Sequence, residues 1–355
     1  MERIWGMSKK ELLARALDWT GMNLLARNTP VWNGLVVLNY HRIGDKQNSL
    51  FDHDLWSASA EDFEQQLRFL TLNFDLIRIQ DLDHIWKSPR GRYVLITFDD
   101  GYLDNYEWAF PLLRAYNSPA TFFLTTGFLD ERKIAWWDEI SWMVRSSSQS
   151  NLKLAPWNEQ EFSLEPAQQS QTIKSLLQIY KGLSGEQTED YMTALADASG
   201  TGRCPAETAD RVWMDWDMIR EMSEAGMDIG GHTVNHPILA NHPEETQKFE
   251  VQHCKHRIET ELNQSISAFS YPVGAQNSFD HLTRNCLEES GYRWGFSYYG
   301  GYSSLGEHDP WDLPRIAIES ENPAALFRSS VSFPQVFSQK KVYTNTDTDP
   351  AASAE

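Results

Sequence analysis

The chain has 355 residues, of which 41% are hydrophobic, and its formal net charge is −19. This length suits one large α/β domain or two smaller ones, and the hydrophobic content is sufficient for a folded core. The excess of acidic residues argues against nucleic acid as a partner, because phosphate backbones attract Lys and Arg.

Cysteine usage and hydropathy give a second set of exclusions. The three cysteines, Cys204, Cys254 and Cys286, are odd in number and lack the spacing of a zinc site or a disulfide framework. The first residues do not form a secretory signal pattern, and no apolar run approaches the 18 residues of a membrane span. We therefore expect a soluble, cytoplasmic protein.

The first pattern along the chain is amphipathic and predicts a helix over residues 8–27, within an N-terminal segment of residues 1–30. Five basic residues against three acidic ones give residues 1–28 a small positive charge within an acidic chain. The helix therefore has two interpretations. It lies peripherally on an anionic membrane, which places the protein at the inner face, or it packs against the core or another subunit.

Short apolar runs then alternate with helical patterns. The predicted strands cover residues 35–40, 75–79, 93–98, 120–125, 227–230, 266–270, 294–297 and 315–318, with helices between them, for example over 60–73 and 244–262. Several runs are apolar throughout, as expected for parallel strands that are buried on both faces. The order and number of the strands predict an α/β barrel over residues 31–335.

Residues 130–211 interrupt the alternation with a polar, helical pattern, which predicts an insertion within the barrel. Trp137 and Asp138, near its beginning, are candidate substrate contacts, because indole rings stack on sugars and carboxylates bind hydroxyl groups. The alternative is that Trp136 and Trp137 fasten the insertion to the barrel. Residues 336–355 have no core-forming pattern and are predicted to be a disordered tail.

Two segments that follow predicted strands carry residues suited to catalysis. Asp99 and Asp100 follow one strand, and His232 and His236 follow another. If one helical turn connects the histidines, both imidazoles project to the same side and can bind one metal ion. One aspartate and two histidines leave a coordination position open, and the second aspartate can then act as a general base.

These segments resemble the motifs of the polysaccharide deacetylases, the NodB-homology or carbohydrate esterase family 4 proteins. The matching runs are TFDDG at 97–101, PATFFL at 119–124 and HTVNHP at 232–237. The resemblance implies a distorted (β/α) barrel of the NodB-homology type with a helical insertion, a divalent metal that is usually Zn²⁺, and hydrolysis of N-acetyl groups. It assigns the base to Asp99 and the metal to Asp100, His232 and His236.

A third motif of the family corresponds to FSYPVG at 269–274. By this resemblance, the backbone N–H of Val273 stabilises the oxyanion. Tyr271, in the same run, is a lesser candidate for contact with a sugar ring, as an aromatic residue near the site. Ser270 stands where the family has an arginine. Arg315, at another predicted strand, is therefore the candidate that orients the base.

The family's late Leu-x-His motif, which supplies the general acid, does not occur after Pro272. His281 and His308 are the histidines in that part of the chain, and His308 is the candidate there, whereas His41 follows an early predicted strand. This order resembles the permuted branch of the family that includes the poly-N-acetylglucosamine deacetylases. His41 is therefore the predicted general acid and His308 the alternative.

Together these features predict metal-dependent N-deacetylation of a sugar in a bacterial surface polysaccharide, an exopolysaccharide or its lipid-linked precursor. The expected partner is thus an N-acetylated glycan or glycolipid. Two alternatives are hydrolysis of a non-glycan amide and a non-catalytic glycan-binding barrel. A protein that only binds has no use for a general base, which favours an enzyme.

Overall fold

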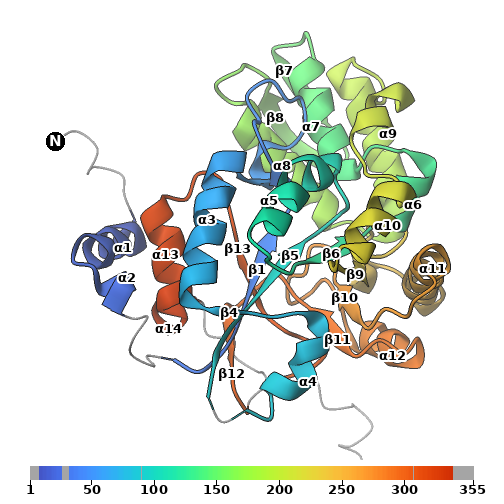
Figure 1. The fold of residues 1–355 in the computed structure, drawn as a ribbon. Helices are drawn as coiled ribbons and strands as arrows, with labels where there is room; N and C mark the ends of the chain where they lie inside the picture. Colours follow the sequence, from blue (N-terminus) through green and yellow to red (C-terminus); the bar gives the residue numbers. More distant parts are fainter. Residues whose placement is uncertain (1–7, 26–31, 89, 307, 339–355) are drawn as a thin grey trace, which may run out of the picture.

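The computed structural model describes residues 8–25, 32–88, 90–306 and 308–338, and a nine-stranded sheet forms its centre (Figure 1). The strands are β1 (Gly34–Tyr40), β4 (Asp75–Leu76), β5 (Arg92–Phe98), β6 (Thr121–Leu124), β9 (Asp228–Gly231), β10 (Ala268–Ser270), β11 (Trp294–Phe296), β12 (Tyr302–Ser304) and β13 (Arg315–Ala317). Their order is β11-β10-β9-β6-β5-β1-β12, with β4 beside β5 and β13 beside β1. All eight predicted strands lie in this sheet, and β12 is the unpredicted ninth.

The sheet curls into a distorted barrel because β13 lies between its two ends. Arg315 of β13 pairs in parallel with Val37 of β1. Leu313, just before β13, bridges in parallel to Phe296 of β11. Only β12 is antiparallel to its neighbour, β1. The α/β barrel that the sequence predicts is thus confirmed.

Helices surround the sheet (Figure 1). They are α1 (Lys9–Trp19), α2 (Met22–Leu25), α3 (Ala60–Asn73), α4 (Leu82–Ile85), α5 (Phe110–Ala115), α6 (Thr126–Glu131), α7 (Trp136–Ser146), α8 (Gln169–Lys181), α9 (Thr188–Ser199), α10 (Trp216–Glu224), α11 (Glu244–Leu262), α12 (His281–Glu289), α13 (Ala324–Ser332) and α14 (Pro334–Phe337). The helices predicted over 60–73 and 244–262 form as α3 and α11. Among the described residues, no helix has both the length and the hydrophobicity needed to cross a membrane.

Three predictions need correction: the extent of the first helix, the secondary structure of the insertion and the beginning of the tail. The first helix is interrupted, because Gly21 adopts a left-handed conformation (φ 72°) that ends α1 before α2 begins. The insertion is not purely helical, since β7 (Asn151–Leu154) and β8 (Asn158–Ser163) form an antiparallel hairpin with Leu152 and Leu154 buried on one face. The predicted tail overlaps α14 at 336–337, while residues 26–27 and 339–355 lie outside the described residues.

The barrel interior changes from apolar to polar toward the carboxyl ends of the strands. Alternate residues of a strand face the same side. The residues of one such set pack in an interior apolar cluster: Leu35, Val37, Leu95, Phe123, Trp294, Phe296 and Leu313. The same alternation continues along β1 to Asn39 and His41, and along β5 to Thr97 and Asp99. The strand pleat therefore directs His41 and Asp99 to the same end of the barrel interior.

Candidate active site

A cleft of about 490 Å³ lies at the carboxyl ends of the barrel strands, a volume typical of ligand-binding pockets. Its walls contain nearly all the site residues that the sequence predicts: His41, Asp99, Asp100, Trp137, His232, His236, Tyr271, Val273 and Arg315. They come from segments that follow four strands, β1, β5, β9 and β10, together with β13 and α7. The parallel sheet brings these distant segments together, because all its carboxyl ends meet at one face.

Asp99 is buried and held by a two-pronged ion pair with Arg315. The two guanidinium Nη atoms donate to Oδ1 and Oδ2 of Asp99, each at 2.8 Å, and Ser270 Oγ donates to Oδ2 at 3.2 Å. Arg315 is itself fixed by donation from Nε to the Ser297 carbonyl at 2.9 Å. Burial raises the pKa of Asp99, but the opposing effects of Arg315, His232 and His41 together outweigh it and hold the pKa well below its usual range. Asp99 therefore stays ionised, as a general base must.

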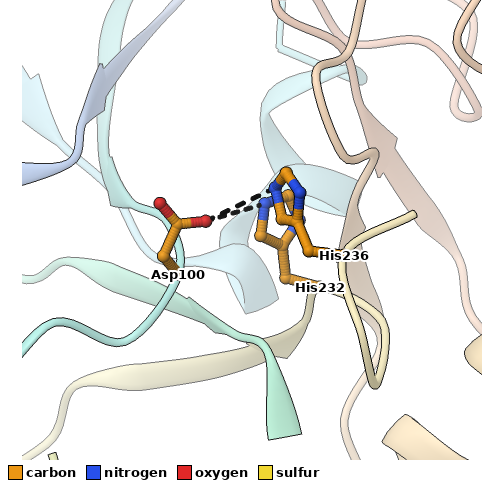
Figure 2. A group of neighbouring side chains, drawn as sticks. All are labelled: Asp100, His232 and His236. Atoms are coloured by element: carbon orange, nitrogen blue, oxygen red, sulfur yellow. Dashed lines mark ion pairs between the residues drawn. The ribbon is translucent and has the colours of Figure 1, made fainter. Parts of the chain in front are cut away.

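Asp100, His232 and His236 converge on one point of the cleft (Figure 2). Asp100 Oδ1 lies 3.4 Å from Nε2 of His232 and 3.5 Å from Nε2 of His236. One ligand atom from each residue lies within 4.8 Å of the others. Asp100 has a left-handed backbone (φ 76°), which reverses the chain direction directly after Asp99. The two neighbouring carboxylates can therefore do different work in the same cleft.

The two histidines converge without the helical turn that the sequence predicts. Thr233 and His236 instead have left-handed φ values of 70° and 55°, which are uncommon for residues other than glycine. Thr233 Oγ1 accepts a hydrogen bond from the His236 N–H at 2.9 Å, so the loop is stabilised locally by a side chain. The predicted conformation is wrong, although both imidazoles reach the same point.

Glu250, a buried residue of α11, supports this loop from behind. Its Oε2 accepts the N–H groups of Val234 and Asn235, each at 2.8 Å, and its Oε1 accepts Asn235 Nδ2 at 2.7 Å. Burial raises the pKa of Glu250, while the hydrogen bonds from Asn235 oppose that shift. The carboxylate thus occupies the centre of the loop that carries His232 and His236.

The chemistry of this donor set fits a divalent metal ion. Asp100 Oδ1 is buried and has no hydrogen-bond partner among the described residues. His232 places Nδ1 2.7 Å from the Ser270 carbonyl, which leaves Nε2 as the ligand atom. Burial, together with repulsion from His232, lowers the pKa of His236 to about 3 and keeps its imidazole in the neutral, metal-binding form. Asp100, His232 and His236 would hold the ion.

Val273 and Tyr271 line the same cleft but differ in what they offer to a substrate. Val273 has a left-handed backbone (φ 62°), a strained conformation for a β-branched residue. Its N–H finds no acceptor among the described residues, so it is available to a substrate oxygen. The Tyr271 hydroxyl instead donates to the Trp311 carbonyl at 2.7 Å, and its ring stacks on Phe279 at 3.8 Å. Tyr271 can therefore present only its ring.

The structure separates the two candidate general acids. His41 lines the cleft, and its ring lies 5.8 Å from that of Tyr298. Burial lowers the pKa of His41, although Asp100 and Asp99 oppose the shift. His308 stacks on Trp86 with ring centroids 4.0 Å apart and is absent from the cleft walls. Of the two candidates, only His41 lines the cleft.

Trp137 and Asp138 join the insertion to the barrel. Asp138 is fully buried, and its carboxylate accepts the Tyr102 hydroxyl at 2.9 Å and the Asp52 N–H at 3.0 Å. The expected contact between Asp138 and sugar hydroxyls is therefore wrong, because protein donors occupy both oxygens. Trp137 contacts the cleft, but its ring packs 4.3 Å from that of His236, and its Nε1 donates to Tyr102. Its position agrees with the fastening alternative.

Several cleft residues were not found from the sequence. They are Asp52, Asp54, Leu55, Lys174, Leu177, Gln178, Lys181, Ala275, Tyr298 and Glu319. Four of them lie on α8 of the insertion, so this segment forms one wall of the cleft. Ser270 and Glu250 were also missed as supports of the site. Ser270 stands in the third motif, but its role as a support of Asp99 could not be read from it; the others stand in no recognised motif, and only Tyr298, near a strand end, carried a further signal.

Comparison with known proteins adds an independent observation. The sequence model described as "Polysaccharide deacetylase" matches residues 87–295, more than half of the chain. The protein is a member of the polysaccharide deacetylase family. The matched residues include Asp99, Asp100, His232, His236 and Tyr271. The resemblance inferred from the motifs is thus confirmed.

Two curated relatives illustrate the range of this polysaccharide deacetylase family. A Bacillus subtilis protein named as a polysaccharide deacetylase, YxkH, is 24% identical over 302 residues, which cover 82% of this chain and 74% of YxkH. The poly-β-1,6-N-acetyl-D-glucosamine N-deacetylase of Staphylococcus aureus is 30% identical over 122 residues. That match spans 31% of this chain and 42% of the Staphylococcus protein.

Solved structures of deacetylases share the fold. The Streptococcus pyogenes deacetylase PplD superposes with a TM-score of 0.53 at 19% identity, covering 81% of this chain and 93% of PplD. IcaB from Ammonifex degensii superposes with a TM-score of 0.51 at 18% identity, covering 85% of this chain and 97% of IcaB. These likenesses confirm the distorted barrel of the NodB-homology type.

Proposed function

We propose that the protein is a divalent-metal-dependent hydrolase that removes the N-acetyl group from an amino sugar. The substrate is part of a bacterial surface polysaccharide, an exopolysaccharide or its lipid-linked precursor, and Zn²⁺ is the proposed ion. One observation carries the proposal. A buried, ionised Asp99 lies in the same cleft as the Asp100–His232–His236 donor set. The partial match to a poly-β-1,6-N-acetyl-D-glucosamine N-deacetylase suggests the class of sugar.

In the proposed reaction, water attacks the acetamide carbonyl carbon and Asp99 accepts the proton of that water. Arg315 keeps Asp99 ionised and aims both carboxylate oxygens. A divalent ion, when bound, supplies Lewis-acid polarisation of the carbonyl and a lowered pKa for water. The N–H of Val273 donates to the oxygen on which negative charge develops. His41 protonates the departing nitrogen, so that acetate and a free amine are released.

The same machinery could hydrolyse a non-glycan amide, and a barrel without catalysis could bind a glycan. The buried pair of Asp99 and Arg315 argues against the second alternative, because burying two charges is costly and contributes nothing to holding a neutral sugar. The insertion supports a substrate larger than a simple amide, since four residues of α8 line the same cleft as the donor set.

The decisive experiment measures acetate release from N-acetylglucosamine oligomers of several linkages, an N-acetylated sugar-lipid and N-acetylated peptides. We expect release from the sugars, its loss after chelation with dipicolinate, and its recovery when Zn²⁺ is added back. Metal analysis should find about one divalent ion per chain. Release from peptides alone would support the amide alternative, and no release with metal present would contradict the enzyme.

A further inference from the structure

The N-terminal helices are attached to the barrel by polar contacts. Asp18 of α1 forms a two-pronged ion pair with Arg328 of α13, at 2.7 and 2.6 Å. Asn23 of α2 donates to Ser329 Oγ at 3.1 Å, and the Ser329 hydroxyl also lies 3.4 Å from the Ala14 carbonyl. An amphipathic helix on a soluble protein normally buries its apolar side instead.

Large apolar side chains of α1 and α2 are nevertheless exposed, although Ala14 of α1 is buried. Of the nine large hydrophobic side chains that are exposed among the described residues, five lie here, and we call them the apolar face: Leu12, Leu13, Trp19, Met22 and Val336. Trp19 is 90% exposed, and the others are 41–50% exposed. Val336 belongs to the same surface, because the neighbouring Phe337 carbonyl accepts the Lys10 ammonium at 2.7 Å. In Figure 1 these helices, α1, α2, α13 and α14, lie together on one side of the molecule.

The charge around the apolar face is positive, although the whole chain carries −19. Lys9, Lys10 and Arg15 are exposed on α1. Asp18, in contrast, is neutralised by Arg328, and Glu11 is engaged in the capping box at Ser8. Exposed apolar residues with a tryptophan, flanked by cations, are the composition of helices that lie in the interface of anionic membranes.

We propose that the apolar face binds peripherally to an anionic phospholipid surface. Trp19, Met22 and the two leucines enter the interface, while Lys9, Lys10 and Arg15 contact lipid phosphates. An anionic bilayer fits this surface better than a second copy of the chain does. A second copy would bring a further net charge of −19 against the first. The proposal does not depend on the proposed function, since neither helix contributes to the walls of the cleft.

The test is co-sedimentation of the full chain with vesicles of phosphatidylcholine and phosphatidylglycerol in a ratio of about 2:1. We expect binding to these vesicles, little binding to pure phosphatidylcholine, and weakening at about 0.5 M NaCl. Trp19→Ser should reduce the partition coefficient by about tenfold, and Lys9→Glu with Arg15→Glu should abolish the preference for anionic lipid.

Trp108→Ser is the matched control, because Trp108 is also about half-exposed but lies outside the apolar face. It should leave vesicle binding unchanged, and the Trp19 variant should retain its circular dichroism and its activity on soluble substrate. Equal binding of the Trp19→Ser variant and the unmodified chain overturns the proposal. So does a concentration-dependent dimer, seen by analytical ultracentrifugation, that Trp19→Ser dissociates, since the face would then belong to a second copy.

Discussion

Two buried aspartates have pKa values shifted in opposite directions. Asp99 lies at the mouth of the barrel, and Asp138 lies at the base of the insertion. Burial raises the pKa of each, but at Asp99 the Arg315 ion pair, together with His232 and His41, overcomes that effect and leaves the pKa well below normal. Asp138 faces the hydroxyl of Tyr102 and a backbone N–H, and although Arg42 lies nearby, burial raises its pKa to about 7.

The difference shows how partners, rather than burial, decide what a carboxylate can do. A cation bound through both carboxylate oxygens keeps Asp99 ionised in a dry site, where it can accept a proton. Neutral donors hold Asp138 in place without fully compensating its charge, which suits a residue that joins two parts of the fold. Four substitutions test this contrast.

Replacing the base should have the largest effect. Asp99→Asn keeps the shape but removes the proton acceptor, so we expect turnover to fall by about 10²–10⁴-fold while bound metal changes little; thermal stability should also fall, because Arg315 is left buried without its counter-ion. Acetate release and metal analysis measure the first two results. Asp138→Asn, the matched buried control, should retain most of the activity. Equal losses in both variants would show that the two aspartates do not differ as proposed.

Glu250 is a third buried carboxylate, held by neutral donors like Asp138 but placed behind the metal-binding loop. Glu250→Gln leaves one acceptor oxygen in place of two and removes the negative charge, so the backbone N–H groups of Val234 and Asn235 and the Asn235 side chain can no longer all be accepted, and the loop should relax. We expect divalent-ion affinity to fall by about 10–100-fold, measured by competition with a chelating dye. Glu245→Gln, at an exposed position of the same helix, should not change it. Unchanged affinity in the Glu250 variant would make that residue purely structural.

Arg315→Lys tests the cation at Asp99 directly. Because its pKa is lowered, Asp99 stays ionised as the pH falls, so the unmodified enzyme should remain active at acidic pH. Lysine keeps the charge but not the two-pronged geometry, so the pKa of Asp99 should rise. The acid limb of the kcat/KM profile should then move upward by about one pH unit. Arg328→Lys, at the similar pair with Asp18, should leave the profile in place. A shift in both variants would rule out a specific effect at Asp99.

The smallest effect concerns stability at Asp138. Its folded pKa lies above the unfolded value, so its contribution is fully present below about pH 4 and is lost as the pH rises to about 7. In the Asp138→Asn variant, the amide at this position does not titrate in that pH range. The free energy of unfolding of the unmodified chain, relative to this variant, should therefore decline between pH 4.5 and 7.5, which urea denaturation measures. Asp197→Asn, at an exposed position, should show no such trend, and a constant difference at Asp138 would contradict the interpretation.

The sequence was informative wherever the pattern was local. The buried parallel strands are apolar runs, so all eight predicted strands are found, and their ends mark the side chains of the cleft. The hairpin β7–β8 was missed because its alternation is short and lies among polar residues. The loop of His232 and His236 was predicted as a helical turn, because the left-handed conformations of Thr233 and His236 depend partly on Glu250, a residue of another element.

Length, charge and motif spacing by themselves determined the barrel class, the family and the candidate residues Asp99, Asp100, His232, His236 and His41. The tertiary structure alone decided what each side chain does, because partners from distant segments set charge and exposure. It paired Arg315 with Asp99, buried Asp138 away from the cleft, and placed α8 of the insertion along one wall. It also left large apolar side chains of α1 exposed, which hydrophobic periodicity could not determine, since periodicity defines a face but not its neighbour.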